Sequence, residues 1–215
     1  MGNSSNKMLS SDWDLNKTIG VITISIISGF IYYLAKQVSI KLLVFTHSVF
    51  STISSIVTMI FQFDPAYSIM ITSVYLPYHT YYLRDEPYGT RDKWSTYIHH
   101  FLGFAFGVTE LFLRKNEMAY LCIQANEASN IFLQWYRWKK TNISGLCFAI
   151  AFFITRVPWD TFYVIPFYLP YTSLYIKIFF VPFYTIQYIW LYKTFKKVHQ
   201  LFFKKKETNE KEKLK

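Results

Sequence analysis

Residues 94–113, WSTYIHHFLGFAFGVTELFL, combine a long apolar run with an adjacent pair of histidines, His99 and His100. About twenty mostly apolar residues are what an α-helix needs to cross the hydrocarbon core of a bilayer. Histidine is costly in hydrocarbon, so the pair marks a candidate site inside a helix bundle. The next apolar stretch carries Glu127 and Asn130 three residues apart on one helix face. The two stretches can therefore present imidazoles and a carboxylate to a shared interior.

The composition indicates a membrane protein. The chain has 215 residues, of which 52% are hydrophobic and 21% aromatic, with a formal net charge of +10. Apolar runs near twenty residues with this aromatic content are typical of transmembrane helices. The charge gathers in a basic tail from Lys193 onward, which predicts contact with a negatively charged membrane surface. No nucleic-acid-binding motif is visible, so we expect no nucleic acid partner.

The pattern of apolar runs predicts an all-α, polytopic membrane protein with about seven transmembrane helices. The spans are expected at residues 18–35, 41–62, 66–83, 95–113, 118–136, 143–165 and 172–193. Short polar joints separate them, and Pro158 is expected to kink the sixth span. The first run lacks a small-residue cleavage site, so we expect it to be a retained span rather than a signal peptide.

Loop charges predict the orientation. One side of the membrane would hold four basic residues, Lys7, Lys17, Arg114 and Lys115, and the other side seventeen, including the tail. Because basic loops remain in the cytosol, the C-terminus is predicted to be cytosolic and the N-terminus to lie outside. His47, His79 and the His99–His100 pair then lie near cytosolic ends of their spans, so a site among them would open toward the cytosol.

Polar side chains recur on single helix faces. On the fifth span, Gln124, Glu127, Asn130 and Gln134 form one stripe. On the fourth, His100 shares a face with Gly103-x-x-x-Gly107, a spacing that lets another helix approach closely. Glutamines in such stripes favour helix–helix hydrogen bonding. An ionisable group at depth, such as Glu127, favours a functional role.

Several motifs occur at positions characteristic of one family. They are the His99-His100 pair, Gly103 after it, Asn126-Glu127 and Asn130 at the distance of a His-Asp-x-x-Asp cluster, Arg156 in the sixth span, and Gln187-x-x-Trp190 near the end of the last. Over about residues 40–195 the chain resembles the TLC domain of ceramide synthases, translocating-chain-associating membrane proteins and TLC-domain-containing lipid-homeostasis proteins. Only one acid of the synthase cluster remains, as Glu127. The chain is therefore most similar to the lipid-homeostasis branch.

The resemblance implies a six-helix TLC bundle at residues 39–199. A luminal N-terminus with a first helix would occupy residues 1–38, and a basic cytosolic tail residues 200–215. It implies a protein that binds or modifies lipids in membrane lipid homeostasis. The alternative is an acyl-CoA-dependent N-acyltransferase of sphingoid bases, similar to ceramide synthase. Whether the chain is an enzyme stays open at this point.

The resemblance also implies roles for single residues. If the chain is an enzyme, His99, His100 and Glu127 are the expected catalytic residues, with an imidazole as base or nucleophile and the carboxylate orienting it. The expected lipid-binding residues are Asn130, Arg156, His47, His79 and Gln124. No metal is expected, because the sequence spacing fixes no third ligand. No cofactor is expected, and acyl-CoA enters only as co-substrate of the alternative. Membrane lipids are the expected partners, and a homo-oligomer stays open.

Other membrane enzymes fit the histidines less well. Di-iron desaturases and hydroxylases need about eight histidines, and the chain has five. Fatty-acid elongases carry a His-x-x-His-His box, whose first position is Thr96 here. A channel or transporter remains an alternative, although no repeat or paired broken helices support it. The ending KEKLK, with Lys211 and Lys213, matches a dilysine retrieval signal and predicts the endoplasmic reticulum.

Overall fold

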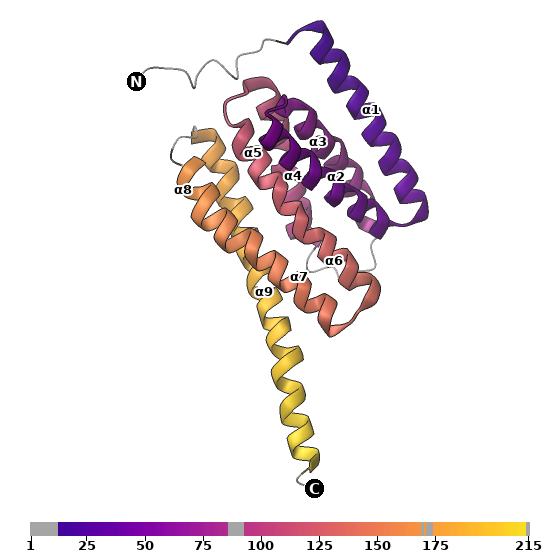
Figure 1. The fold of residues 1–215 in the computed structure, drawn as a ribbon, viewed down its shortest axis with the longest axis vertical. Coiled ribbons are helices and arrows are strands. Elements are labelled where there is room, and N and C mark those ends of the chain that lie inside the picture. Colours follow the sequence, from indigo (N-terminus) through magenta and orange to yellow (C-terminus); the bar gives the residue numbers. More distant parts are fainter. Residues whose placement is uncertain (1–12, 86–92, 169, 171–173, 214–215) are drawn as a thin grey trace. The chain divides into compact units, whose positions relative to one another are not determined.

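A computed structural model describes residues 13–85, 93–168, 170 and 174–213 (Figure 1). The regular structure of these residues is helical throughout, in seven continuous stretches. They are α1 (Leu15–Val38), α2 (Ile40–Phe61), α3 (Pro65–Tyr82), α4 (Lys93–Leu113), α5 (Glu117–Gln124) with α6 (Ala128–Lys139), α7 (Asn142–Ile154) with α8 (Ile165–Tyr168), and α9 (Leu174–Lys213). A 3₁₀ turn, Ala125–Glu127, joins α5 to α6, and a π-helical segment, Thr155–Val164, joins α7 to α8.

The first six stretches begin and end within three residues of the expected spans. The seventh begins two residues late and runs on to Lys213, so helix continues into the predicted basic tail. Within the described residues, three helices are long and apolar enough to cross a membrane: Leu15–Val38, Ile40–Phe61 and Asn142–Val164. An all-helical protein is thus confirmed, and crossings by the other stretches stay a prediction.

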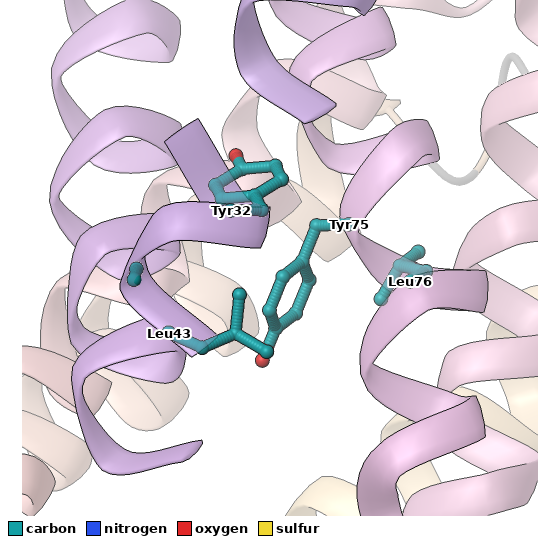
Figure 2. Packing of buried hydrophobic residues seen from close by; sticks show 5 residues of the cluster. Tyr32, Leu43, Tyr75 and Leu76 are labelled. Atoms are coloured by element: carbon teal, nitrogen blue, oxygen red, sulfur yellow. The ribbon is translucent and has the colours of Figure 1, made fainter. Parts of the chain in front are cut away.

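The helices form two compact units, one with α1–α5, up to Ala125, and one with α6–α9, from Asn126. In the first unit, α3 packs against α1, α2, α4 and α5. Its core contains Tyr32 and Ala35 from α1, Leu43 from α2, and Tyr75 and Leu76 from α3 (Figure 2). The first helix therefore belongs to this bundle. The predicted domain boundary at residue 38 stays a prediction.

Ser39 alone connects α1 to α2. Its backbone N–H donates to the Ala35 carbonyl at the end of α1, and its side chain accepts from the Leu42 N–H at the start of α2. One residue thus satisfies backbone groups of two helix ends that would otherwise lack partners. Since α1 and α2 also pack against each other, they form a tight helical hairpin.

The predicted close approach at Gly103-x-x-x-Gly107 is confirmed. A Cβ at Gly103 would lie 3.2 Å from Leu76 Cδ1, and one at Gly107 would lie 2.8 Å from both Ser73 Oγ and the Tyr120 hydroxyl. Leu76 and Ser73 belong to α3. The missing side chains thus let α4 lie directly against α3, as small residues do between membrane helices.

An ion-pair network lies at the end of the first unit where α1 begins. Lys17 Nζ lies 2.6 Å from Asp64 Oδ2, Arg114 Nη2 lies 2.9 Å from Asp64 Oδ1, and Arg114 Nε lies 2.8 Å from Glu117 Oε1. The last contact is an ion pair by distance but not an aligned hydrogen bond. Glu110 accepts from the Asn116 N–H at 2.6 Å. The network ties the start of α1 to the turns before α3 and α5.

Candidate functional site

Three of the predicted histidines lie together inside the first unit. His47 of α2, His79 of α3 and His100 of α4 are each at most 6% exposed, and Tyr32 of α1 and Tyr75 of α3 are buried with them. We call these five residues the histidine cluster. Imidazoles drawn from three helices thus share one interior, as expected of polar groups that cannot face lipid tails.

Ring stacking and hydrogen bonds hold the histidine cluster together. The His47 ring stacks on Tyr75 with centroids 3.5 Å apart and planes inclined by 3°. The Tyr75 hydroxyl lies 2.9 Å from His79 Nδ1, and the His79 and His100 rings are 4.9 Å apart. Figure 2 shows Tyr32 and Tyr75 on neighbouring helices of this core. The contacts therefore run without a break from α1 to α4.

The hydrogen bonds assign the proton of His100. The Thr80 hydroxyl donates to the Leu76 carbonyl at 2.6 Å and lies 3.0 Å from His100 Nδ1. A hydroxyl has one proton, so toward His100 the Thr80 oxygen accepts, and Nδ1 carries the hydrogen. In the neutral ring, Nε2 of His100 then presents a lone pair, which is the form a base or nucleophile needs.

The same argument applies to His47. The Tyr32 hydroxyl donates to the Ile71 carbonyl at 3.3 Å and lies 3.2 Å from His47 Nδ1. His47 Nδ1 is therefore the donor to Tyr32. His47 Nε2 is buried and has no hydrogen-bond partner among the described residues. A buried polar atom of this kind is rare and calls for an explanation such as a functional role.

His99 lies beside the cluster. It is half-buried, whereas His100 is buried, and the two rings are 5.9 Å apart. Adjacent residues point about 100° apart around a helix, so only one of the pair can enter the centre of the bundle. His100 is that residue.

The second unit holds a different set of predicted residues around a buried arginine. Arg156 Nε donates to Gln187 Oε1 at 2.7 Å, and Asn126 Nδ2 donates to Asp160 Oδ1 at 2.7 Å. Arg156 also interacts electrostatically with Asp160 and Glu127. We call these five residues the arginine cluster.

Glu127 is fixed from its own helix, because Asn130 Nδ2 donates to Glu127 Oε2 at 2.7 Å. Arg156 and Asp160 both belong to the π-helical segment around Pro158. Proline removes a backbone donor, and π-helical stretches occur frequently at functional sites. At Pro158, where a kink is expected, the structure has this π-helical segment, in which Arg156 and Asp160 are buried.

Asp160 is the functional candidate that the sequence analysis missed. Its spacing of four residues from Arg156 was the available signal, because side chains at i and i+4 are neighbours on a helix. Thr80 was also missed, since nothing in its sequence context marks it as a partner of His100. Gln187 was expected only through the family resemblance.

Gln124 connects helices of the first unit. Its Nε2 donates to the Ser68 carbonyl at 3.1 Å and lies 3.0 Å from Ser68 Oγ and 3.3 Å from the Ser51 carbonyl. These bonds hold α5 to α2 and α3, which is the helix-packing role that membrane glutamines commonly take. A lipid contact by Gln124 stays a prediction.

The predicted site residues are divided between the two units. His47, His79, His99, His100 and Gln124 belong to the first unit, and Glu127, Asn130 and Arg156 to the second. A common cavity for His100 and Glu127 stays a prediction. Within the described parts of the chain, no group of three or more His, Cys, Asp or Glu side chains is arranged to hold a metal ion.

No protein-family model, curated protein or solved structure matches the chain.

Proposed function

We propose that the chain is a TLC-type integral membrane protein that binds or modifies lipids and acts in membrane lipid homeostasis. The histidine cluster is the observation that carries this proposal. Three imidazoles are buried between helices whose outer faces are apolar, with Ile19, Ile22, Ile26 and Phe30 of α1 each more than half exposed. Such outer faces suit lipid tails, and ionisable groups inside such a bundle mark functional sites.

The proposal includes seven membrane crossings with the C-terminus in the cytosol and residence in the endoplasmic reticulum. The helix lengths support it, since the 22 residues of α2 extend about 33 Å, close to the ~30 Å thickness of the hydrocarbon core. The loop charges support the orientation, and Lys211 with Lys213 supports the location.

Acyl transfer to a sphingoid amine is the second candidate, and the protonation of His100 favours it. In this step Nε2 of His100 takes a proton from the ammonium group. The freed amine nitrogen attacks the thioester carbonyl of acyl-CoA, a C–N bond forms and the C–S bond breaks. The coenzyme A thiolate leaves and takes up the proton that the acylated nitrogen loses. A lone pair on Nε2, held in place through Thr80, supplies the base that this step needs.

In either case Arg156 is better suited to positioning than to clamping an anionic group. Its Nε already donates to Gln187 Oε1, and its Nη1 lies 3.1 Å from the Thr155 hydroxyl. A buried guanidinium whose hydrogen bonds are fixed within the bundle is suited to holding helices in place. Within the proposal, Arg156 joins the π-helical segment to α9 through Gln187.

Lipid profiles of cells with and without the gene test the proposal. The null cells are complemented with the wild type, with His100→Ala, or with His199→Ala, a matched control at an exposed position of α9. We expect the wild type and His199→Ala to restore the profile and His100→Ala to fail at equal abundance. A lost ceramide pool identifies the acyltransferase, and a shift in phospholipid acyl chains alone identifies the lipid-homeostasis protein. Unchanged lipids in the null cells refute both candidates.

A further inference from the structure

Basic residues gather at the end of the first unit opposite the ion-pair network. Lys36 lies in the last turn of α1, Lys41 in the first turn of α2, Arg84 just after α3, and Lys93 at the start of α4. Contacts between these segments show that they form one end of the bundle. The Lys36 ammonium, for example, lies 4.3 Å from the ring centroid of Tyr82 in α3.

Two tyrosines accompany these cations. The Arg84 guanidinium lies 4.6 Å from the ring centroid of Tyr81, and Lys93 Nζ donates to the Arg84 carbonyl at 3.0 Å. We call Lys36, Lys41, Arg84 and Lys93, together with Tyr81 and Tyr82, the basic collar. Cation–π contacts of this kind orient the charged groups but leave their charge unneutralised.

The cations at the two ends of the unit differ in whether they form ion pairs. At the other end, Lys17 and Arg114 lie 2.6–2.9 Å from carboxylates. In the collar, Lys36, Lys41 and Lys93 take part in no ion pair with another described residue. Within the described residues, no carboxylate forms an ion pair with these three lysines.

The distance between the two ends matches a bilayer. From Lys17 to Lys36 the helix rises about 28 Å at 1.5 Å per residue, against a hydrocarbon core of ~30 Å. When one end lies at one membrane surface, the collar lies at the depth of the headgroups of the other. Tyrosines are enriched at that depth.

We propose that the basic collar binds the headgroups of anionic phospholipids in one membrane leaflet. Headgroup phosphates carry the negative charge that attracts the collar lysines, and the tyrosine rings pack beside them at the interface. The proposal rests on the membrane crossing of the first unit proposed above, and it is independent of any role in lipid homeostasis.

Lipid selectivity of the full chain in vesicles tests this proposal. The protein is reconstituted in phosphatidylcholine vesicles with a trace of spin-labelled phosphatidylserine or phosphatidylcholine, and electron spin resonance measures the fraction of each probe immobilised by the protein. The variants are Lys36→Gln, Lys36→Arg, and Lys115→Gln as a control that removes one exposed charge near the opposite end. All variants have the same basic tail, so its contribution to the lipid preference cancels in the comparison.

We expect Lys36→Gln to lower the preference for phosphatidylserine by up to about fivefold at low salt, the value of one lysine near an anionic surface. Lys36→Arg and Lys115→Gln should keep the wild-type preference. The proposed headgroup binding is overturned if Lys36→Gln and Lys115→Gln lower the preference for phosphatidylserine equally. It is also overturned if neither variant lowers this preference. If neither probe is immobilised by the wild type, the membrane crossing itself is refuted, which separates the two failures.

Discussion

Thr80 decides which nitrogen of His100 carries the proton, because its single hydroxyl hydrogen is already donated to Leu76. A threonine with no charge therefore sets the acid–base character of a histidine on the next helix. The same holds for Tyr32, whose hydroxyl oxygen accepts a hydrogen bond from His47 Nδ1 on the neighbouring helix. These hydroxyls act by position, and their role becomes visible only when the helices are packed.

Thr80→Val should weaken the fold and the activity together. Valine keeps the shape of the side chain but leaves Nδ1 of His100 without its acceptor, at a cost of about 1–3 kcal/mol. We expect a lower midpoint of thermal unfolding in detergent and a partial loss of the lipid phenotype. Thr80→Ser, which retains the hydroxyl, serves as the control and should behave like the wild type. Equal behaviour of Val and Ser would argue against the assigned hydrogen bond.

Glu117 should make stability depend on pH. Burial raises its pKa to about 7, with contributions from nearby Asp64 and Glu110, while Arg114 opposes the shift. Between the ordinary value near 4.5 and about 7, the folded state holds this proton and the unfolded state does not. Stability should therefore fall as pH rises through this window, by at most about 3 kcal/mol, and show no further change from Glu117 above it.

Glu117→Gln removes the titrating group, so its unfolding midpoint should vary less between pH 5 and 8 than that of the wild type. The largest difference is expected at pH 8, where the wild type carries the buried charge. Melting curves at several pH values provide the measurement. Parallel pH profiles for the two proteins would show that Glu117 does not titrate in this range.

At the scale of the elements, the packing of α4 on α3 depends on glycine. Gly107→Ala places a Cβ 2.8 Å from Ser73 Oγ and the Tyr120 hydroxyl, and the neighbours must move. We expect a loss of about 1–3 kcal/mol, typical of overpacking. Gly29→Ala in α1 is the matched control, because its Cβ meets only Val74 at 3.7 Å. Alanine has a higher helix propensity than glycine, so Gly29→Ala should leave the stability unchanged or raise it slightly. Thermal unfolding of both variants checks the pair, and equal losses would contradict the close approach.

The extents of the helices could be predicted from the sequence because the length of an apolar run largely determines them. The π-helical segment could not, because Pro158 indicates an interruption but does not say how the chain accommodates it. For Asp160, the sequence offered one signal, its spacing of four residues from Arg156. Its contact with Asn126 depends on how that segment packs against the 3₁₀ turn, which no spacing in the sequence expresses.

At the scale of the whole molecule, the division into two units was not predictable from periodicity, which describes single helices and not their partners. The sequence analysis placed the histidines and Glu127 in one site, which stays a prediction. The structure adds that His47, His79 and His100 meet through ring contacts within α1–α4. Tyr75, which stacks on two of these rings, had no distinguishing signal in a segment rich in tyrosine.

The orientation predicts which chain end is accessible. A tag at Lys215 should be reached by antibody after selective permeabilisation of the plasma membrane, and a tag at Met1 only after all membranes are opened. The reason is the excess of basic residues on the side of the C-terminus. Both tags reached at the first step would contradict seven crossings.

The tail predicts residence in the endoplasmic reticulum. Changing Lys211 and Lys213 together to Ser removes the dilysine pattern and should let the protein move to later compartments, as seen by microscopy. Changing Lys204 and Lys205 to Ser removes the same charge outside the pattern and is the control. An intact double variant that stays in place would count against the signal.

The single residue between α1 and α2 has a consequence for biogenesis. Because Ser39 alone separates α1 from α2, no soluble loop lies between the first two apolar segments. In the proposed topology, the two helices would therefore enter the membrane as one pair. Tyr32 and His47, on the two arms of that hairpin, would then meet before the remaining helices have been synthesised.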